Sequence, residues 1–370
     1  MSAIYIGLMS GTSMDGIDAA LVDFADPAQP QLLDFTTLQY DDALLQELHL
    51  LNRPDEDEVH LAGAANRKVG NAFAAAANQL LANNKLDARQ VVAIGSHGQT
   101  VRHTPDGEFG FSLQIGDAHS IAVQTGIDVI ADFRNKDIAL GGQGAPLVPA
   151  FHRAVFSHTS IDRAVVNIGG IANISYLPAN KSSPVLGFDT GPGNTLMDGW
   201  CRKHLNQPYD KDGAWGAGGQ ADPQLLRSLL SHPYFKEAAP KSTGRDAFHL
   251  DWLEQQLAVQ PKKLDPQDVQ ATLLQLTAQN IADGLAELPV AEVYICGGGA
   301  RNLALMAALA NVLPQCKIHT TEELGVDPDA VEGIAFAWLA YAHKNGISGN
   351  IPEVTGASRA AILGACYPAA

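Results

Sequence analysis

Short apolar runs separated by small, polar turns recur along the chain. Residues 4–9 and 17–24 are mainly apolar, and the segment between them is rich in glycine and hydroxyl side chains. This pattern predicts a β-hairpin. The same order of strand, glycine turn and strand returns over residues 164–177, with its turn at Gly169-Gly170. Because such repetition indicates two related halves, we expect two lobes with a cleft between them.

Further apolar patterns predict the remaining elements. Helices are expected where apolar residues recur every three or four positions, and strands where they run together or alternate. The predicted strands are residues 31–38, 91–94, 111–115, 127–133, 185–188, 293–296 and 317–320. The predicted helices are residues 41–52, 57–83, 117–125, 195–204, 266–287, 303–312 and 329–343. This order predicts an α/β fold with duplicated mixed β-sheets and flanking helices.

Length and composition change this picture in two ways. The 370 residues exceed one comfortable hydrophobic core, so we expect lobes at residues 1–133 and 134–345, with the segment 346–370 returning to the first lobe. Hydrophobic residues make up 46% of the chain and charged residues 17%, which is typical of soluble globular proteins. The formal charge of -16 argues against nucleic-acid and anionic-membrane partners, because both need a basic face.

The four cysteines show no CxxC spacing and no neighbouring histidine cluster. We therefore expect reduced thiols in a cytoplasmic protein. The N-terminus shows no signal-peptide pattern, and no apolar run is long enough to span a bilayer.

Glycine-rich turns are the first candidates for ligand chemistry. The turns at residues 10–13 and 169–170 can offer backbone N–H groups to a phosphate. The loop at residues 297–302, GGGARN, lies between a predicted strand and a predicted helix, where bare backbone accepts a base and ribose. The alternative is that these glycines serve packing only. The two commonest nucleotide motifs, GxxxxGK[ST] and GxGxxG, are absent.

Asp189 is the candidate carboxylate. It follows a predicted strand and precedes Thr190, Gly191, Pro192 and Gly193, so its side chain is expected to face the cleft. The alternative is that Asp189 is the N-cap of the next helix.

The ordered motifs GTSMDG, SHGQT, DFRNKDIALGGQGAPLVP, VNIGGIANIS, FDTGPGN and CGGGARN resemble the anhydro-N-acetylmuramic acid kinase family. The resemblance extends from Ile4 to at least Tyr341. That family belongs to the sugar kinase, heat-shock chaperone and actin superfamily. The resemblance therefore implies a two-lobed, actin/hexokinase-like (ribonuclease H-like) fold with an interlobe cleft.

The resemblance also implies an activity. Water is added at C1 of 1,6-anhydro-N-acetylmuramic acid, and the γ-phosphoryl group of ATP moves to O6 with Mg²⁺ as cofactor. The products are N-acetylmuramic acid 6-phosphate and ADP, in peptidoglycan recycling. By the same resemblance, Asp189 is the general base for the attacking water, held by neighbours such as Asn194.

Site residues follow from these motifs. The candidate nucleotide-binding residues are Gly11, Thr12, Ser13, Met14, Asp15, Gly16, Ile17, Asp18, Asn167, Gly169, Gly170, Gly297, Gly298, Gly299 and Asn302. The candidate substrate-binding residues are Ser96, His97, Gln99, Arg134, Gln143, Gly144 and Asn194.

Arg134 is the candidate for the lactyl carboxylate of the substrate, because a guanidinium binds a carboxylate with two parallel hydrogen bonds. The alternative is a surface salt bridge with Asp132 or Asp137. His97 alone is more often a structural histidine.

The chain departs from the superfamily at its first phosphate turn. A carboxylate usually precedes the glycines there, and this chain has Leu8 and Met9. We therefore expect metal binding to rest on Asp15 or Glu332, through water. No role is assigned to the loop 241–245.

Two other functions stay open at this point. One is another kinase or phosphatase of the superfamily, acting on acetate, a simple sugar or polyphosphate. The other is a non-catalytic ATP-driven switch, although no long partner-binding insertion is present. A homodimer is expected from the family resemblance.

Overall fold

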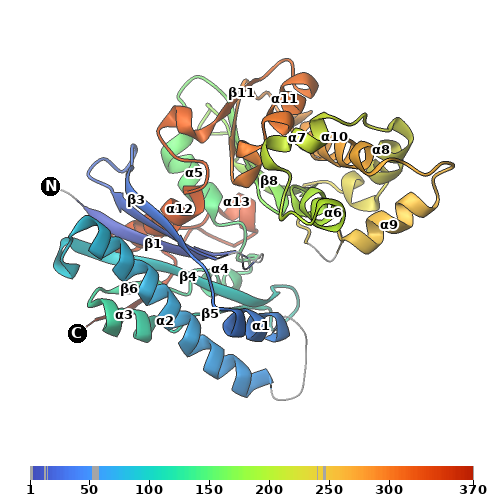
Figure 1. Ribbon diagram of the computed structural model, residues 1–370. Coiled ribbons are helices and arrows are strands. Elements are labelled where there is room, and N and C mark those ends of the chain that lie inside the picture. Colours follow the sequence, from blue (N-terminus) through green and yellow to red (C-terminus); the bar gives the residue numbers. More distant parts are fainter. Residues whose placement is uncertain are drawn as a thin grey trace. The chain divides into compact units, whose positions relative to one another are not determined.

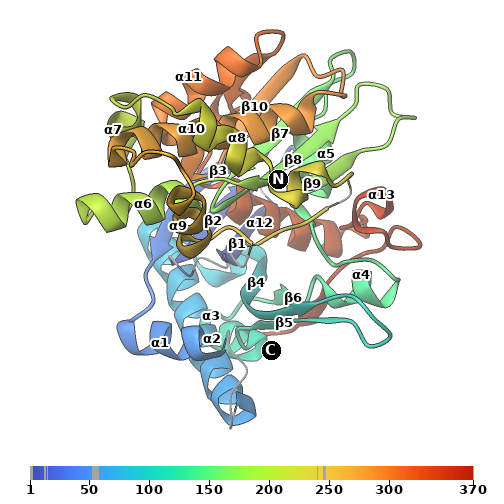
Figure 2. The same ribbon diagram turned by 90° about the vertical axis from the view of Figure 1, so that its right-hand side faces the viewer.

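The chain forms two compact units, shown from two directions in Figures 1 and 2. The computed structural model describes residues 3–11, 14, 16–51, 58–239, 241–244 and 247–369. The first unit contains Met1–Val155 and Ala330–Ala370, and the second contains Phe156–Asp329. The chain thus leaves the first unit after Val155 and returns at Ala330, whereas the boundaries expected from the sequence lay at 133/134 and near 345.

The first unit is built on a mixed sheet in the order β12-β6-β4-β1-β2-β3, with β5 paired to β4. β1 is parallel to β4, and β4 is parallel to β6, while the other pairs are antiparallel. The strands are β1 (Ile4–Ser10), β2 (Ile17–Asp23), β3 (Gln31–Leu38), β4 (Val91–Thr104), β5 (Phe111–Ile115), β6 (Val129–Ala131) and β12 (Ala365–Tyr367). Through β12, the end of the chain returns to this sheet.

Helices cover both faces of the first sheet (Figure 1). Ile6 and Leu8 of β1 point into a core shared with α2 (Glu58–Asn84). Between them, Gly7 faces α12 (Val331–Lys344), where a methyl group would lie 1.8 Å from the carbonyl oxygen of Gly333. The glycine therefore lets the helix and the strand approach closely. The other helices of this part of the chain are α1 (Asp42–Leu51), α3 (Ala118–Thr125), α4 (Asn135–Ala139), α5 (Val148–Phe156) and α13 (Pro352–Thr355).

The second unit has a five-stranded sheet in the order β11-β10-β7-β8-β9. β10 is parallel to both β7 and β11, and the β7-β8-β9 part is antiparallel. The strands are β7 (Arg163–Ile168), β8 (Ile171–Leu177), β9 (Leu186–Pro192), β10 (Glu292–Cys296) and β11 (Lys317–Thr320).

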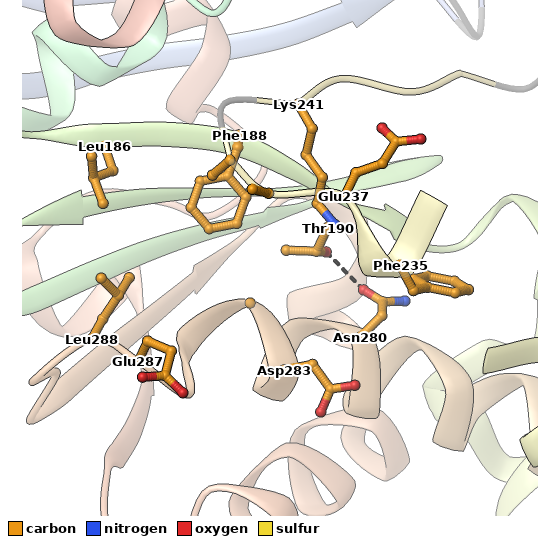
Figure 3. A pocket seen from close by; sticks show the side chains of 13 residues that line it. Leu186, Phe188, Thr190, Phe235, Glu237, Lys241, Asn280, Asp283, Glu287 and Leu288 are labelled. Atoms are coloured by element: carbon orange, nitrogen blue, oxygen red, sulfur yellow. Dashed lines mark hydrogen bonds between the residues drawn. The ribbon is translucent and has the colours of Figure 1, made fainter. Parts of the chain in front are cut away.

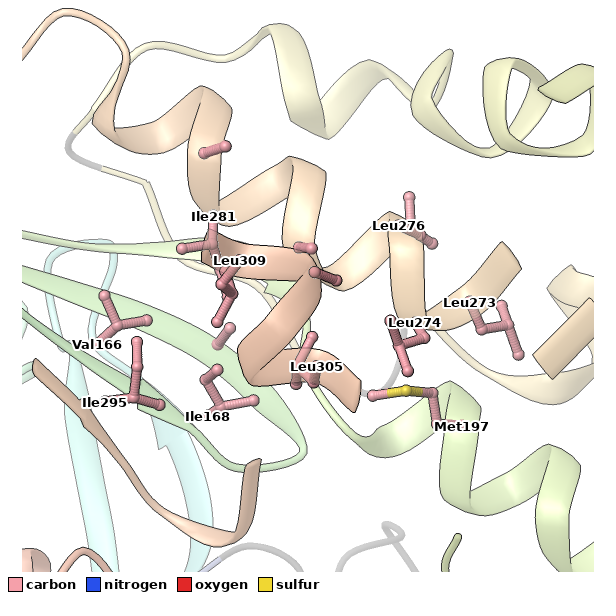
Figure 4. Close-up of a cluster of buried hydrophobic side chains, with 14 of the residues drawn as sticks. Val166, Ile168, Met197, Leu273, Leu274, Leu276, Ile281, Ile295, Leu305 and Leu309 are labelled. Atoms are coloured by element: carbon pink, nitrogen blue, oxygen red, sulfur yellow. The ribbon is translucent and has the colours of Figure 1, made fainter. Parts of the chain in front are cut away.

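The central helix of the second unit is α10 (Pro266–Leu285), which is buried along most of its length. Figure 4 shows its Ile281 and neighbouring leucines packed with Leu305 and Leu309 of α11 (Leu303–Val312) and with strand residues such as Val166. The other helices are α6 (Thr195–Leu205), α7 (Ala214–Ala217), α8 (Pro223–Leu230) and α9 (Leu250–Ala258). Short 3₁₀ helices lie at η1 (Ala88–Gln90), η2 (Lys211–Gly213), η3 (Pro233–Lys236), η4 (Gly298–Arg301) and η5 (Thr321–Leu324).

The predicted α/β class with two mixed sheets is confirmed, and the long helices begin and end within a few residues of their predicted bounds. Two strand predictions were too short. β4 continues through the SHGQT motif to Thr104, where a loop was expected, and β9 continues past Phe188 to Pro192. Both extensions carry polar or glycine residues that look like turns but pair with neighbouring strands.

In the part of the chain that the structure describes, no helix combines the length and apolar character needed to cross a membrane.

Candidate active site

The predicted first phosphate turn follows β1. Thr12, Ser13 and Asp15 lie outside the described residues. Around them, Met14 donates its backbone N–H to the Gly11 carbonyl at 3.1 Å and has a φ of 57°. Gly16 has a φ of 152°, and a methyl group there would lie 2.8 Å from Thr37 Cγ2. The edges of the turn therefore have a tight backbone, and its binding of phosphate stays a prediction.

The next two predicted nucleotide residues differ from each other. Ile17 is fully buried in the core of the first unit, so its side chain serves packing. Asp18 accepts a hydrogen bond from Thr37 Oγ1 at 2.7 Å and is half-buried.

Gln99 fastens this turn to β4. Its side chain is fully buried. Its Oε1 lies 2.7 Å from Ser10 Oγ, and its Nε2 donates to the Gly11 carbonyl at 3.1 Å and to the Thr100 carbonyl at 3.2 Å. Ser10 Oγ also lies 2.9 Å from the Gly16 carbonyl. Because both ends of the amide are used inside the protein, the geometry supports a role in shaping the turn rather than the predicted contact with sugar.

Arg134 is anchored by neutral partners. Its Nε and Nη2 lie 3.1 and 2.9 Å from His97 Nε2, and its Nη1 donates to the Gly144 carbonyl at 2.7 Å. These bonds use three of the five N–H groups of a guanidinium. They leave one N–H on each terminal nitrogen beyond these contacts, which is the fork that a carboxylate accepts.

The alternative for Arg134, a salt bridge with Asp132 or Asp137, does not describe this geometry. Asp132 accepts from Asn135 Nδ2 at 2.8 Å. Asp137 accepts from the backbone N–H of Gly144 at 2.8 Å.

His97 takes one tautomer in this arrangement. Its Nδ1 lies 2.9 Å from the Gly98 carbonyl, which can only accept, so Nδ1 carries the proton. Nε2 is then the acceptor for Arg134. Burial and the positive charge of Arg134 lower the pKa of His97 well below its usual value. A neutral His97 that orients Arg134 agrees with the structural alternative, and its contact with the sugar stays a prediction.

Ser96 lines a different space. Its hydroxyl is buried and has no hydrogen-bond partner among the described residues. The pocket beside it has a volume of about 290 Å³ and is mainly polar, with Ser112, Gln114 and Asn135 in its wall. His97 also lines this pocket, whereas Arg134, Gln143 and Gly144 are absent from the described lining. Of the predicted substrate residues, Ser96 and His97 thus line this pocket, and Arg134 and Gly144 are joined to His97 by hydrogen bonds.

Glu332 lies in the first turn of α12 and is half-buried. Burial raises its pKa, the nearby charge of Asp18 raises it further, and Arg134 lowers it. In the described part of the chain, no group of three or more acidic, histidine or cysteine side chains forms a metal cluster. A hydrated Mg²⁺ needs only one or two carboxylates besides phosphate oxygens, so the predicted role of Glu332 in metal binding stays a prediction that a larger cluster is not needed to meet.

In the second unit, the Gly169-Gly170 turn joins β7 to β8 and contacts the start of α6. The Gly169 carbonyl accepts from the N–H of Asn194 at 2.8 Å, and the Gly170 carbonyl accepts from Gly193 and Thr195 at 2.9 and 3.1 Å. Among the described residues, a methyl group on Gly169 would meet only the Ile171 carbonyl, at 3.7 Å. Space therefore remains beside this glycine for a ligand.

The three glycines after β10 differ in their surroundings. A methyl group would lie 2.3 Å from Asn167 Oδ1 at Gly297 and 2.4 Å from Ile168 Cβ at Gly299. At Gly298 it would meet only Asn194 Nδ2, at 3.7 Å, in the part of the chain that the structure describes. The packing alternative thus describes Gly297 and Gly299, while Gly298 keeps the open backbone surface that a nucleotide needs.

Two predicted asparagines flank this loop. Asn302 is the N-cap of α11, and its Oδ1 accepts from the Leu305 N–H at 2.9 Å. Asn194 donates from Nδ2 to the Ile168 carbonyl at 3.0 Å instead of holding Asp189 as expected. Asn194 therefore belongs with the glycine loops.

Asp189 lies within β9, so the N-cap alternative is wrong; the N-cap of α6 is Asn194. Its Oδ2 accepts from the Thr243 N–H at 3.0 Å. Its backbone N–H donates to the Lys241 carbonyl at 3.0 Å, and its carbonyl accepts from Tyr234 Oη at 2.7 Å. Burial raises the pKa of Asp189 to about 6, although the hydrogen bond from Thr243 opposes the shift. A carboxylate with this pKa can take up a proton near neutral pH.

Sequence reasoning did not assign a role to Thr243, Lys241 or Tyr234, although the KSTGRD motif contains two of them. The sequence did show a polar, glycine-containing loop at residues 241–245, but gave no reason to assign it a role. Its link to Asp189 could not be read from spacing, because it depends on a backbone N–H.

A pocket of about 300 Å³ lies beside β9, between this strand and α10 (Figure 3). Phe188 and Thr190 line it, and Thr190 donates to Asn280 Oδ1 at 2.7 Å. Asp189, between them in sequence, is not among its lining residues. This pocket is therefore separate from the candidate base.

Known proteins resemble this chain along its whole length. The anhydro-N-acetylmuramic acid kinases of Shewanella sp. (strain ANA-3) and Shewanella oneidensis are each 58% identical over 368 residues, covering 99% of both chains. Among solved structures, the activator of the 2-hydroxyisocaproyl-CoA dehydratase from Clostridium difficile, with bound ADPNP, has a TM-score of 0.50 at 12% identity. That comparison covers 94% of this chain and 96% of the activator, and it shows a shared fold.

A family model described as anhydro-N-acetylmuramic acid kinase matches residues 3–369. With the identity to the Shewanella enzymes, this match shows that the chain belongs to the anhydro-N-acetylmuramic acid kinase family, as its motifs predicted.

Proposed function

We propose that this chain uses ATP and water to convert 1,6-anhydro-N-acetylmuramic acid into N-acetylmuramic acid 6-phosphate and ADP, in peptidoglycan recycling. The observation that carries the proposed mechanism is the half-buried Asp189 carboxylate, which has a pKa near 6 and a backbone N–H donor. Membership of the family indicates the substrate, and Asp189 is the proposed general base.

In the proposed reaction, Asp189 accepts a proton from the water that attacks C1. The C1–O6 bond breaks, and its electron pair goes to O6. O6 then attacks the γ-phosphorus, the bond to the β-phosphate oxygen breaks, and ADP leaves. The hydrogen bond from Thr243 orients the carboxylate while leaving its other oxygen for the water.

For nucleotide binding, we assign Gly298 and Gly169 to the surfaces that approach ATP. Of the candidate glycines at 169 and 297–299, these two have open space beside them in the described structure. Glu332 and Asp18 are the candidate carboxylates for a hydrated Mg²⁺, since their proximity raises the pKa of Glu332. When bound, this ion would neutralise charge on the phosphates.

For sugar recognition, we assign Arg134 to the lactyl carboxylate. His97 and Gly144 fix the guanidinium in place before the substrate arrives, so little side-chain entropy is lost on binding. Ser96 offers a buried hydroxyl with unused hydrogen-bonding capacity in the described structure, which suits a sugar hydroxyl or the N-acetyl group.

The use of ATP and four free cysteines support a cytoplasmic location. We also propose a homodimer, as expected for the family. Light scattering of the purified chain tests the homodimer, and a monomer at micromolar concentration would refute it.

The reaction is tested by incubating the protein with ATP, Mg²⁺ and 1,6-anhydro-N-acetylmuramic acid in ¹⁸O-labelled water. We expect one label at C1 of the product and none in the phosphate. Label in the phosphate, or ATP hydrolysis without sugar phosphate, would contradict the proposal. The same protein without sugar is the control for background hydrolysis.

A further inference from the structure

Asp137 is a fully buried carboxylate that accepts three hydrogen bonds. Its Oδ2 accepts from the backbone N–H of Gly144 at 2.8 Å. Its Oδ1 accepts from Asn350 Nδ2 at 2.6 Å and from Thr355 Oγ1 at 2.8 Å. Burying a carboxylate costs free energy unless its oxygens are bonded in this way. The loop around Gly144 is therefore fixed to a charged group inside the first unit.

Gly144 connects this carboxylate to Arg134. Its N–H donates to Asp137, and its carbonyl accepts from Arg134 Nη1 at 2.7 Å. Its φ is 67°, and a methyl group would lie 2.9 Å from Ile138 Cγ1. A glycine is therefore favoured here, and this single residue links the Asp137 carboxylate to the Arg134 guanidinium.

The C-terminal segment holds Asp137 from the other side. Besides the bonds from Asn350 and Thr355, the Thr355 carbonyl accepts from the Gln143 N–H at 2.7 Å. The Leu140 carbonyl accepts from the Ser358 N–H at 2.8 Å. The segment from Asn350 to Ser358 thus contacts the residues that flank Gly144.

We propose that Asp137 is a positioning residue that orients Arg134 through Gly144, with Asn350 and Thr355 holding the carboxylate. This inference depends on the proposed role of Arg134 in binding the lactyl carboxylate. Together with His97, Asp137 fixes the guanidinium from two sides, so that its remaining N–H pair keeps one direction. The negative charge of Asp137 also favours the charged form of Arg134.

The experiment compares two sugars, 1,6-anhydro-N-acetylmuramic acid and 1,6-anhydro-N-acetylglucosamine, which lacks the lactyl group. The measured quantity is the ratio of kcat/KM for the first sugar to kcat/KM for the second. We expect Asp137→Asn to lower this ratio about tenfold, because a small displacement of a binding group is costly. Thr355→Val keeps the side-chain shape and removes one donor, so we expect a smaller decrease.

Asp128→Asn is the matched control. Asp128 also holds the C-terminal part of the chain, through Lys344 Nζ at 2.8 Å and the Ala369 N–H at 3.2 Å, without contact to Gly144 or Arg134. We expect this variant to lower the melting temperature and keep the wild-type ratio. If loosening this part of the chain were enough to change the ratio, Asp128→Asn would change it too, and the inference would be wrong.

A double variant separates this inference from the proposed function. In an Arg134→Lys background, Asp137→Asn should cause no further decrease of the ratio, because both act on the same contact. If Arg134→Lys lowers the ratio but Asp137→Asn and Thr355→Val leave it at the wild-type value, the positioning role alone is refuted. If Arg134→Lys keeps the wild-type ratio, the assignment of Arg134 fails, and the role of Asp137 fails with it.

Discussion

Arg134 in the first unit and Asp189 in the second are half-buried candidate site residues of opposite charge. Burial is the largest cause of both pKa shifts, and in each case it favours the neutral form. The pKa of Arg134 falls to about 10, so the guanidinium stays charged at neutral pH. The pKa of Asp189 rises to about 6, which places its proton exchange near neutral pH.

Burial therefore suits the two side chains to different roles. Arg134 keeps a permanent charge, oriented by a neutral histidine and a carbonyl, and is suited to recognition. Asp189 becomes a group whose protonation changes under working conditions, and is suited to proton transfer. The comparison predicts that changes at Asp189 act on turnover, whereas changes at Arg134 act on substrate choice.

Asp189→Asn should have the largest effect. An amide is nearly isosteric with the carboxylate and can still accept the Thr243 N–H, so folding and ligand binding should persist. It cannot take a proton at neutral pH, and loss of a general base typically lowers kcat about 10²–10⁴-fold. The measurement is kcat beside the melting temperature and the dissociation constant for the sugar. A stable variant with near-normal kcat would remove Asp189 from the mechanism.

Arg134→Lys should have the next largest effect, and on binding rather than on turnover. Lysine keeps the charge and loses the fork, which should weaken binding of the lactyl sugar by about 1–3 kcal/mol. Calorimetric titration with 1,6-anhydro-N-acetylmuramic acid measures the loss. 1,6-Anhydro-N-acetylglucosamine is the control ligand and should bind the variant and the wild type alike. Equal weakening for both sugars would contradict the assignment of Arg134 to the lactyl carboxylate.

The pH dependence tests the contrast directly. Because Asp189 must be deprotonated, kcat/KM should fall about tenfold per pH unit below about pH 6. Arg134 should cause no loss of kcat/KM until the pH approaches about 10.

The pKa of Asp189 also affects stability. Since the Asp189 carboxyl has a higher pKa in the folded chain than in the unfolded chain, its contribution to the free energy of unfolding falls as pH rises from 3.8 to about 6. Asp189→Asn should lack this contribution. A Thr243→Pro variant loses the N–H donor to Asp189. If the fall of kcat/KM at low pH stays the same in this variant, another group titrates there.

The smallest expected effect separates backbone recognition in the second unit from side-chain recognition in the first. Gly298→Val should raise KM for ATP several-fold, leave KM for the sugar nearly unchanged and keep the melting temperature, because its surroundings are open. Gly299→Val is the matched control; it should lower the melting temperature, because Ile168 occupies the space. Normal KM values for ATP in Gly298→Val would exclude this loop from nucleotide binding.

Much of the fold was predictable because apolar periodicity decides where helices and strands form. The bounds of α10, α11 and the β7-β8 hairpin follow directly from that pattern. It failed at β4 and β9, where Ser96, Gln99 and Thr190 are buried polar residues within strands. Such residues look like loop residues in sequence, since their burial depends on hydrogen bonds formed only in the fold.

The candidate site was predictable in its residue types and less so in its contacts. Motifs singled out Arg134 and Asp189, and the structure gives both a half-buried place with defined partners. The inward-facing role of Gln99, the neutral partners of Arg134 and the Thr243 contact depend on residues distant in sequence. No spacing rule encodes contacts of that kind.

The return of the chain to the first unit at Ala330 has a consequence for synthesis on the ribosome. A nascent chain emerges from its N-terminus, so all residues of the second unit are available before α12 and β12 exist. The second unit can therefore complete its folding first. The surface of the first sheet around Gly7 and Gly95 stays exposed until α12 has been synthesised and covers it. Chaperones that bind apolar surface would find their target there, during the interval before the last helix is made.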